Sequence, residues 1–358
     1  MSRNELETNA RSLVAHDKGI LAADESFPTI EKRFRSVGIV STEENRRAYR
    51  ETLFSAPGLS DFISGVILFD ETIRQKARDG TPLVAVLVRQ GILPGIKVDK
   101  GTVALAGFPG EKITEGLDGL RARLEEYRTL GAHFAKWRAV ITIGANPTIP
   151  TRACLEANAH ALARYAALSQ EAGLVPVVEP EVLMDGSHSL ERCEETTEAA
   201  LQAVYAALRE QRVVVEETLL KPNMVLPGKA CPEKVSVEQV AEATLRCLRR
   251  TVPAAVPGIV FLSGGQSPIQ ATQHLQAINA RGPHPWQMSF SYGRALQEPA
   301  LAEWRPDATK NAAAQKALLH RACCNSAARR SVYSGLMELN GQAAAAVREC
   351  LNEAKVSG

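Results

Sequence analysis

The sequence predicts a single α/β domain over residues 1–358, folded as a (β/α)₈ TIM barrel with an additional helical region and tail at its C-terminal end. A chain of 358 residues is long enough for one large barrel. Apolar or β-branched runs alternate with helical segments, and no linker or sharp change of composition divides the chain. We expect the barrel over about residues 19–297 and the C-terminal helices and tail over about 298–358. The alternation also fits an open, doubly wound sheet.

Eight segments have the apolar, β-branched character of buried strands, and eight is the number that a closed barrel requires. Between them, Ser236 and Gln239 form a capping-box pair that predicts a helix to about Arg250. A second helix is expected over 151–170, with a glycine at position 173 as its stop signal. The predicted strands are Gly19–Asp24, Ile63–Phe69, Gly95–Asp99, Phe134–Ile141, Val175–Glu181, Thr218–Asn223, Gly258–Ser263 and Met288–Tyr292.

The charge balance and the pattern of cysteines and histidines exclude several classes of protein. Lys and Arg number 42 against 40 Asp and Glu, and this net charge of +2 is too balanced to predict a nucleic-acid partner. Neither a signal peptide nor a run of about 18 apolar residues is present, so we expect a cytoplasmic protein without a membrane partner. The seven cysteines lack CxxC spacing and the seven histidines lack an HExxH or other ligand-spaced pair. We therefore expect neither a metal site nor a cofactor.

Charged residues stand where five of the predicted strands end. Side chains two apart on a strand share a face, which groups Lys136 with Arg138 and Glu179 with Glu181. A single such residue is usually a rim residue or one half of a structural ion pair. Five strands together favour a functional site at the carboxyl end of the barrel, because an interior without function is filled by Val, Ile and Leu. The residues are Asp24, Lys97, Asp99, Lys136, Arg138, Glu179, Glu181 and Lys221, of which Lys97 and Asp99 are candidates for a structural pair.

Two segments that follow the seventh and eighth strands have the features of anion-binding turns. Backbone N–H groups in a glycine-rich turn and at a helix N-terminus attract phosphate. In α/β barrels, phosphate sites commonly lie after these two strands. A Gly-Gly pair alone also fits a simple turn, and the arginine of the second segment is what favours an anion. The segments are Ser263-Gly264-Gly265-Gln266, followed by Ser267-Pro268, and Ser291-Tyr292-Gly293-Arg294.

Lys221, in the stretch ETLLKPNM, is the candidate nucleophile. Burial and a nearby cation such as Lys136 both favour the neutral amine, which can attack a carbonyl and form a Schiff base. Loss of water from the carbinolamine needs an acid/base partner, for which Glu179 or Glu181 is the candidate. Asp24 is the candidate base for the hydroxyl proton that must leave when the neighbouring carbon–carbon bond breaks.

Ten motifs spread over about residues 19–297 resemble those of the class I fructose-1,6-bisphosphate aldolase family. The resemblance implies a (β/α)₈ barrel, usually a homotetramer, that reversibly cleaves fructose 1,6-bisphosphate to dihydroxyacetone phosphate and glyceraldehyde 3-phosphate without a metal. It places the activity in glycolysis, gluconeogenesis or the Calvin cycle. The motifs are GILAADES, GVILFDET, GIKVDKG, GLDGL, FAKWR, VPVVEPE, TLLKPNMV, RRTVP, FLSGGQS and FSYGRALQ.

The resemblance also implies a role for each matching residue. Lys221 would form the Schiff base, Glu179 would act as acid and base in its formation, and Asp24 would take the proton of the C4 hydroxyl. Lys136, Arg138 and Glu181 would complete the polar cluster. One phosphate would meet the glycine-rich segments, and the other would meet the segment that follows Asp24, together with Lys97. The residues implied for phosphate binding are Ser263, Gly264, Gly265, Ser291, Gly293 and Arg294 on one side, and Ser26, Thr29, Lys97 and nearby Arg33 on the other.

The sequence departs from the family pattern at two places. Animal and plant members typically read DESTGS, whereas Phe27 and Pro28 replace the flexible Thr-Gly pair here, and Thr29 keeps a hydroxyl. Those relatives also end in a tyrosine associated with proton exchange at the enamine carbon. This chain ends in Gly358, and its last tyrosine is Tyr333. The C-terminal departure leaves open which group protonates the enamine.

Two other readings of the function remain open at this point. The same chemistry on sedoheptulose 1,7-bisphosphate or fructose 1-phosphate is compatible with a site that recognises the ends of its substrate. The non-enzymatic alternative is a catalytically silent scaffold that binds a partner through the barrel surface. The complete set of Asp24, Lys136, Glu179 and Lys221 argues against a scaffold, because such a protein has no use for buried charge.

Overall fold

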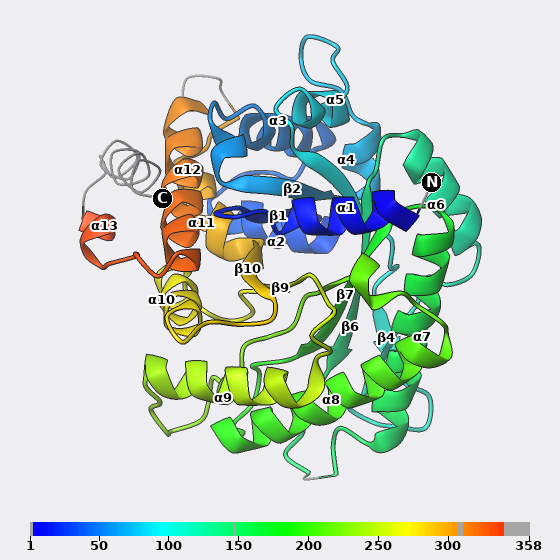
Figure 1. Ribbon diagram of the computed structural model, residues 1–358. Helices are drawn as coiled ribbons and strands as arrows, with labels where there is room; N and C mark the ends of the chain where they lie inside the picture. The colour runs from blue at the N-terminus through cyan, green and yellow to red at the C-terminus, as the bar shows by residue number, and fades with distance from the viewer. Residues whose placement is uncertain (1–2, 147, 307–310, 340–358) are drawn as a thin grey trace.

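The computed structural model describes residues 3–146, 148–306 and 311–339. At its centre, eight parallel strands close into a barrel in the order β1-β10-β9-β8-β7-β6-β3-β2 (Figure 1). The predicted (β/α)₈ barrel is confirmed, and each predicted strand overlaps one strand of the barrel. The strands are β1 (Gly19–Ala23), β2 (Ile63–Leu68), β3 (Leu93–Lys97), β6 (Phe134–Ile141), β7 (Val175–Val182), β8 (Leu219–Leu220), β9 (Gly258–Phe261) and β10 (Gln287–Tyr292).

Strand β8 is shorter than the six residues predicted from the sequence. The N–H of Lys221 still donates to the carbonyl of Val178 on β7, at 2.8 Å. The next residue is Pro222, which has no N–H to continue the ladder. The chain therefore leaves the sheet directly after Lys221, which stands at the carboxyl end of the barrel.

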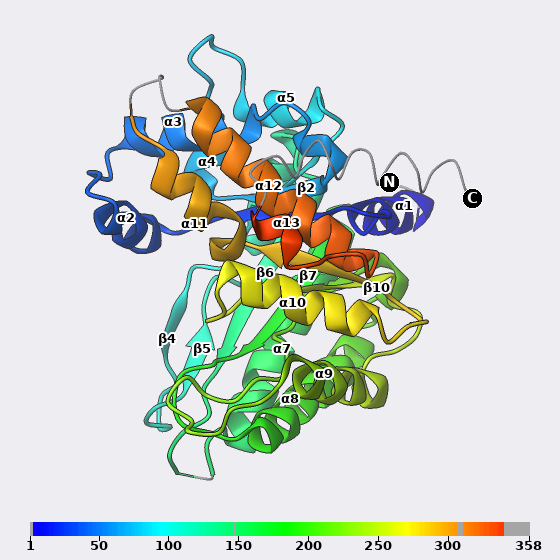
Figure 2. The ribbon, with the colours of Figure 1, turned by 90° about the vertical axis from the view of Figure 1, so that its left-hand side faces the viewer.

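The helices lie around the barrel (Figures 1 and 2). Both helices predicted from the sequence are present, and Ser236 and Gln239 form the expected capping box. Among the described residues, no helix combines the length and the apolar character needed to cross a membrane. The helices are α1 (Arg3–Leu13), α2 (Phe27–Ser36), α3 (Glu43–Phe54), α4 (Asp70–Arg74), α5 (Leu83–Val88), α6 (Leu120–Thr129), α7 (Arg152–Glu171), α8 (Leu190–Glu210), α9 (Val237–Thr251), α10 (Pro268–Asn279), α11 (Arg294–Glu303), α12 (Asn311–Arg329) and α13 (Leu336–Leu339), with the 3₁₀ turns η1 (Leu59–Asp61) and η2 (Val215–Glu217).

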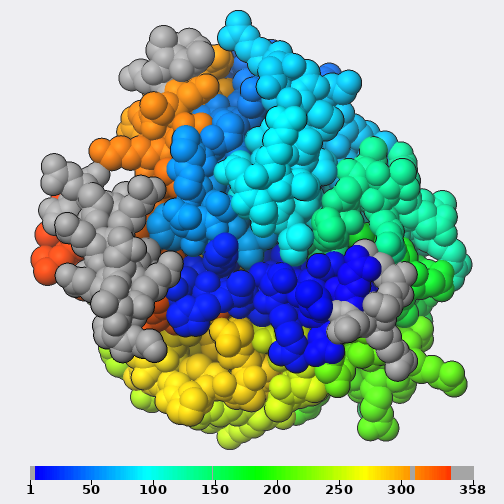
Figure 3. All heavy atoms as spheres, turned by 45° about the horizontal axis from the view of Figure 1, so that its top comes forward, coloured from blue at the N-terminus to red at the C-terminus, as the bar shows by residue number. Residues whose placement is uncertain are grey.

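Helix α1 closes the end of the barrel where the strands begin. Leu13 at its end and Val14, the next residue, are buried against inward-facing side chains that include Phe134 of β6 and Val175 and Val177 of β7. The ring of Phe134 fills the space that a Cβ would need at Gly95. In Figure 3, the blue N-terminal segment runs across the middle of the face shown. We call the buried cluster that includes Leu13, Val14, Phe134, Val175 and Val177 the apolar plug.

The region after the barrel is helical, as predicted. Helices α11, α12 and α13 follow β10, and Arg329 at the end of α12 donates to the carbonyl of Ala15 at 2.5 Å. Residues 340–358, where the predicted tail falls, lie outside the described residues. A short antiparallel hairpin of β4 (Thr102–Ala104) and β5 (Lys112–Thr114), which the sequence analysis did not predict, follows β3.

Candidate active site

A cavity of about 970 Å³ opens at the carboxyl ends of the barrel strands. It collects side chains from strand ends that are far apart in the sequence, which is the arrangement expected of a site in this fold. All the candidate site residues except Gly265 line it: Asp24, Ser26, Thr29, Arg33, Lys97, Lys136, Arg138, Glu179, Glu181, Lys221, Ser263, Gly264, Ser291, Gly293 and Arg294.

The strand register explains why the charged groups meet. Lys97 lies opposite Lys136 in the β3–β6 pair, and Arg138 lies opposite Glu179 in the β6–β7 pair. These side chains alternate with outward-facing residues such as Trp137, which is fully buried between the barrel and its helices. The expectation that residues two apart share the inner face is therefore confirmed.

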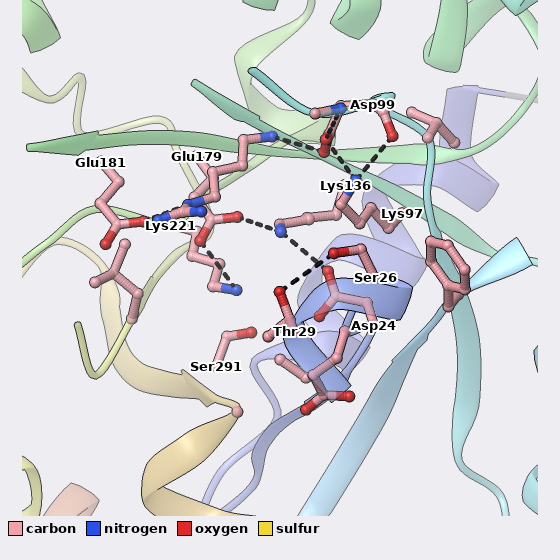
Figure 4. A pocket seen from close by; sticks show the side chains of 18 of the residues that line it. Asp24, Ser26, Thr29, Lys97, Asp99, Lys136, Glu179, Glu181, Lys221 and Ser291 are labelled. Carbon is pink, nitrogen blue, oxygen red and sulfur yellow. Dashed lines mark hydrogen bonds and ion pairs between the residues drawn. The ribbon is translucent and has the colours of Figure 1, made fainter. Parts of the chain in front are cut away.

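Lys136 is held by two carboxylates (Figure 4). Its Nζ lies 3.0 Å from Oδ2 of Asp24 and 2.8 Å from Oε2 of Glu179. The lysine side chain is only 5% exposed. Burial alone would lower its pKa, but the carboxylates of Asp24 and Glu179 outweigh burial and raise the pKa above its usual range. Lys136 is therefore the lysine of the site that keeps its proton and its positive charge.

Lys221 has a different environment, although it lies beside the same glutamate. Its Nζ is 3.2 Å from Oε1 of Glu179, and its side chain is 4% exposed. Burial lowers the pKa of Lys221; Glu179 opposes this shift, and the charge of Lys136 adds to it. The lowered pKa has the direction expected from the sequence, and burial is a larger cause of it than the charge of Lys136. Of the two lysines, Lys221 loses its proton more readily.

The two carboxylates of the cluster are ionised in the resting site. Burial would raise the pKa of Asp24, but the charges of Lys136 and Lys221 lower it well below its usual range. The pKa of Glu179 is also lowered: burial opposes ionisation, and the positive charges of Lys136, Lys221 and Arg138 together outweigh it. Both groups are therefore available as proton acceptors.

A second set of ion pairs surrounds this cluster. The Nε of Arg138 pairs with Glu181, and the Nζ of Lys97 lies 2.5 Å from Oδ1 of Asp99. The predicted pair of Lys97 with Asp99 is thus present. Asp99 also accepts the backbone N–H of Arg138 at 3.2 Å and that of Gly101 at 3.1 Å. These contacts fix the ends of β3 and β6 relative to each other.

The segments after β9 and β10 form one side of the cavity. Arg294 donates to the carbonyls of Gly264 and Gln266, at 3.3 and 2.8 Å, and so joins the two segments. The Oγ of Ser291 is buried without a hydrogen-bond partner among the described residues. Gly265 lies outside the lining, where the Lys229 side chain occupies the space beside its Cα.

The N-terminus of α2 forms the opposite side. Ser26 is the N-cap residue, but its side chain does not cap the helix. Instead, its Oγ lies 3.2 Å from Oγ1 of Thr29. Arg33 is paired with Glu25, and its guanidinium lies near Gly293. Arg33 therefore also reaches towards the segment after β10, and its place near the phosphate at Ser26 and Lys97 stays a prediction.

Sequence reasoning missed a buried network that supports this wall. Glu25 accepts from Arg50 at 2.6 Å and from Gln297 at 2.7 Å, in addition to its pair with Arg33. The sequence signal for Glu25 was its place directly after Asp24 in AADES. Arg50 and Gln297 lie on helices and carry no local signal of a role in the site.

Tyr333, the last tyrosine of the chain, is not among the residues that line the cavity. Its Oη donates to Oε1 of Glu338 at 2.8 Å, and Arg321 pairs with the same carboxylate at 2.5 Å. The Tyr333 hydroxyl is thus engaged with Glu338 outside the cavity lining.

Fold and cavity together define the class: a (β/α)₈-barrel enzyme that gathers two buried lysines and their carboxylates at the carboxyl ends of its strands. Comparison with known proteins gives the family. The model of the class-I fructose-bisphosphate aldolases, described as glycolytic, matches residues 5–352. The chain belongs to this family, and is accordingly an aldolase, a lyase.

Individual relatives agree with this assignment. The chain is 60% identical over 336 residues to the "Probable fructose-bisphosphate aldolase class 1" of Xanthomonas axonopodis pv. citri, covering 94% of this chain and all of the relative. It is 53% identical to "Fructose-bisphosphate aldolase 4, cytosolic" of Arabidopsis thaliana, covering 94% and 85% of the two chains. The solved structure of the Plasmodium falciparum aldolase, in complex with TRAP and a small-molecule inhibitor, matches with a TM-score of 0.92 and 50% identity over 93% of this chain and 96% of that one.

Proposed function

We propose that the protein reversibly cleaves fructose 1,6-bisphosphate to dihydroxyacetone phosphate and glyceraldehyde 3-phosphate through a Schiff base on Lys221, without a metal. The observation that carries the proposal is the difference between two neighbouring lysines. Lys136 is held by two carboxylates and stays charged, whereas Lys221 shares only Glu179 with it and has a lowered pKa.

The first step is attack of the neutral Lys221 amine on the C2 carbonyl of the open-chain ketose. Glu179 takes the proton of the Lys221 ammonium across the 3.2 Å contact and so prepares the nucleophile. The carbinolamine then loses its C2 hydroxyl as water, and the protonated Glu179 supplies the proton for that departure. The product is an iminium between C2 and Nζ.

The second step is cleavage of the C3–C4 bond. Asp24 takes the proton of the C4 hydroxyl, the C4 oxygen becomes the aldehyde, and the bonding electrons flow into the iminium to leave an enamine. The charge of Lys136 keeps Asp24 ionised until that proton arrives. Protonation of the enamine at C3 and hydrolysis then release dihydroxyacetone phosphate. Tyr333 does not supply that proton in this proposal, because its hydroxyl donates to Glu338.

The two phosphates of the substrate occupy the two walls of the cavity. The phosphate on C1 binds between Ser263, Gly264 and Arg294, after β9 and β10. The phosphate on the other end binds the N-terminus of α2, where Ser26 and Thr29 offer hydroxyls and Lys97 offers a cation. Helix N-termini and exposed N–H groups favour such anions.

Turnover of the purified protein tests the proposed activity. We expect cleavage of fructose 1,6-bisphosphate that is unchanged by a chelator, and a lower kcat/KM for both fructose 1-phosphate and sedoheptulose 1,7-bisphosphate. A clear preference for the seven-carbon substrate would replace the substrate assignment. Activity that a chelator abolishes and zinc restores would instead contradict the metal-independent mechanism.

Assembly and location follow the family in this proposal. We place the protein in the cytoplasm as a homotetramer that serves glycolysis, gluconeogenesis or the Calvin cycle. The support is the name of the Arabidopsis relative, which is described as cytosolic. Light scattering coupled to size-exclusion chromatography measures the subunit number, and a monomeric mass would contradict the tetramer.

A further inference from the structure

We propose that Phe27 is a positioning residue for substrate binding: it fixes the N-terminus of α2 so that the hydroxyls of Ser26 and Thr29 are ready for the phosphate remote from Lys221. This proposal rests on the proposed function, because that phosphate belongs to a ketose bisphosphate. It concerns the position at which this chain replaces a flexible Thr-Gly pair by Phe27 and Pro28.

The hydroxyls of Ser26 and Thr29 at this helix start face each other and the cavity, and that of Ser26 does not cap the helix. Ser26 stands at the N-cap with an extended backbone, yet its side chain makes no capping bond, in contrast to Thr42 at the start of α3, which accepts the N–H of Asn45 at 3.1 Å. The Oγ of Ser26 lies instead 3.2 Å from Oγ1 of Thr29, and both residues line the cavity. Helix α2 is ten residues long, so its N-terminus carries the partial positive charge of a full helix.

Phe27 is 49% exposed, but its ring is held by two neighbouring side chains. Its ring meets the edge of Phe69 with the two centroids 5.3 Å apart and the planes at 84°. The guanidinium of Arg46 lies over the same ring, 4.8 Å from its centroid. Aromatic pairs in this geometry and cations over aromatic faces both stabilise a side chain beyond its burial.

The contacts of Phe27 connect three separate elements. Phe69 follows β2 and lines the cavity, and Arg46 belongs to α3. Arg46 is itself fixed, because its Nη2 lies 2.5 Å from Glu71 and its Nη1 donates to the carbonyl of Ser41 at 2.9 Å. The first residue of α2 is therefore held against two neighbouring elements rather than projecting freely into solvent.

Pro28 adds rigidity at the next position. Its ring fixes φ near the helical value and so restricts the backbone at the first turn of α2. A site that is already ordered loses less conformational entropy when a ligand binds. We therefore expect Phe27 and Pro28 to strengthen binding of the remote phosphate. The chemistry at Lys221 is unaffected, because the ring contacts described for Phe27 involve no member of the lysine cluster.

The experiment compares two substrates that differ in the remote phosphate. In Phe27→Ala, we expect KM for fructose 1,6-bisphosphate to rise about fivefold while kcat stays within about twofold. Fructose 1-phosphate lacks that phosphate, so its kcat/KM is expected to stay at the wild-type value. Phe27→Tyr keeps the ring and should restore KM. Pro28→Gly should raise KM for the bisphosphate alone, by a smaller factor.

The matched control is Val88→Ala, which truncates a side chain of similar exposure, 51%, outside the cavity lining. An unchanged KM for the bisphosphate in Phe27→Ala, or an equal loss on both substrates, would overturn the positioning role. Wild-type turnover of both substrates is measured in the same series. If the wild type cleaved neither, the proposed function itself would fail and this proposal with it.

Discussion

The two ends of the barrel are built from the same strands but hold opposite kinds of side chain. On the inner face of β7, Val175 and Val177 belong to the apolar plug, while Glu179 and Glu181 line the cavity only a few residues further on. Strand β6 changes in the same way, from Phe134 to Lys136. The change from apolar to charged residues thus occurs within single strands. It divides the barrel into an end that stabilises the fold and an end that serves chemistry.

The energetics of the two ends differ accordingly. Each large apolar side chain in the plug contributes roughly 1.5–3 kcal/mol by leaving water. A buried ion cluster such as that of Lys136 gains little net stability, because the attraction between its charges mostly offsets their desolvation. Substitutions at the carboxyl end should therefore change activity more than stability, and those at the plug should do the reverse.

The largest effect is expected for Lys221→Met. The variant should lose activity by roughly 10⁴-fold or more, because the nucleophile is gone. Its free energy of unfolding should fall only modestly, since Glu179 keeps Lys136 as a counter-charge at 2.8 Å after Lys221 is removed. Cleavage rates and urea denaturation measure the two quantities. Lys234→Met, at an exposed lysine, is the control and should change neither. A strongly destabilised Lys221→Met would contradict the division between the two ends.

Phe134→Ala is the matching substitution in the plug. We expect the free energy of unfolding to fall by about 3–5 kcal/mol, because the ring fills the space between Gly95 and α1. The folded fraction should keep its kcat, since the ring belongs to the apolar plug below Lys136 and does not line the cavity. Phe108→Ala, at a partly exposed loop residue, provides the control. Lost turnover with an unchanged denaturation midpoint would show that the two ends are not separate.

The smallest expected effect is a change in how stability depends on pH. It distinguishes the two ends of the barrel without removing any apolar contact. Asp24 and Glu179 have lowered pKa values in the folded protein, so their stabilising contribution is present above the usual carboxylate pKa of about 4 and is lost as the pH falls through the lowered values. The plug does not titrate. Acid denaturation should therefore weaken the wild type more steeply than the double variant Asp24→Asn with Glu179→Gln. Parallel pH curves of unfolding free energy would contradict this assignment.

Much of the architecture could be predicted because a buried parallel strand leaves a clear apolar run in the sequence. All eight barrel strands were identified in this way. The hairpin of β4 and β5 was missed, since Thr102, Val103 and Ala104 are exposed and show no alternation of apolar and polar residues. The length of β8 was overestimated, although Pro222 could have marked its end.

The site was predictable where function forces an unusual residue into a strand end. Lys136, Glu179 and Lys221 stand out because apolar neighbours surround them in the sequence. The partners of Glu25 could not be predicted in the same way, since Arg50 lies on a helix 25 residues further along the chain and Gln297 on another helix 272 residues away. Polar residues are common on helices, so their presence there does not indicate a role in the site. Only the folded structure identifies these contacts.

The central claim is that Lys221, whose pKa is lowered by burial, becomes the nucleophile while its neighbour Lys136 remains a charge. Reduction with borohydride in the presence of dihydroxyacetone phosphate, followed by peptide mapping with mass spectrometry, tests it most directly. We predict one reduced adduct, on the peptide that contains Lys221, and none on the peptide that contains Lys136. An adduct on Lys136, or no adduct on the Lys221 peptide, would contradict the account.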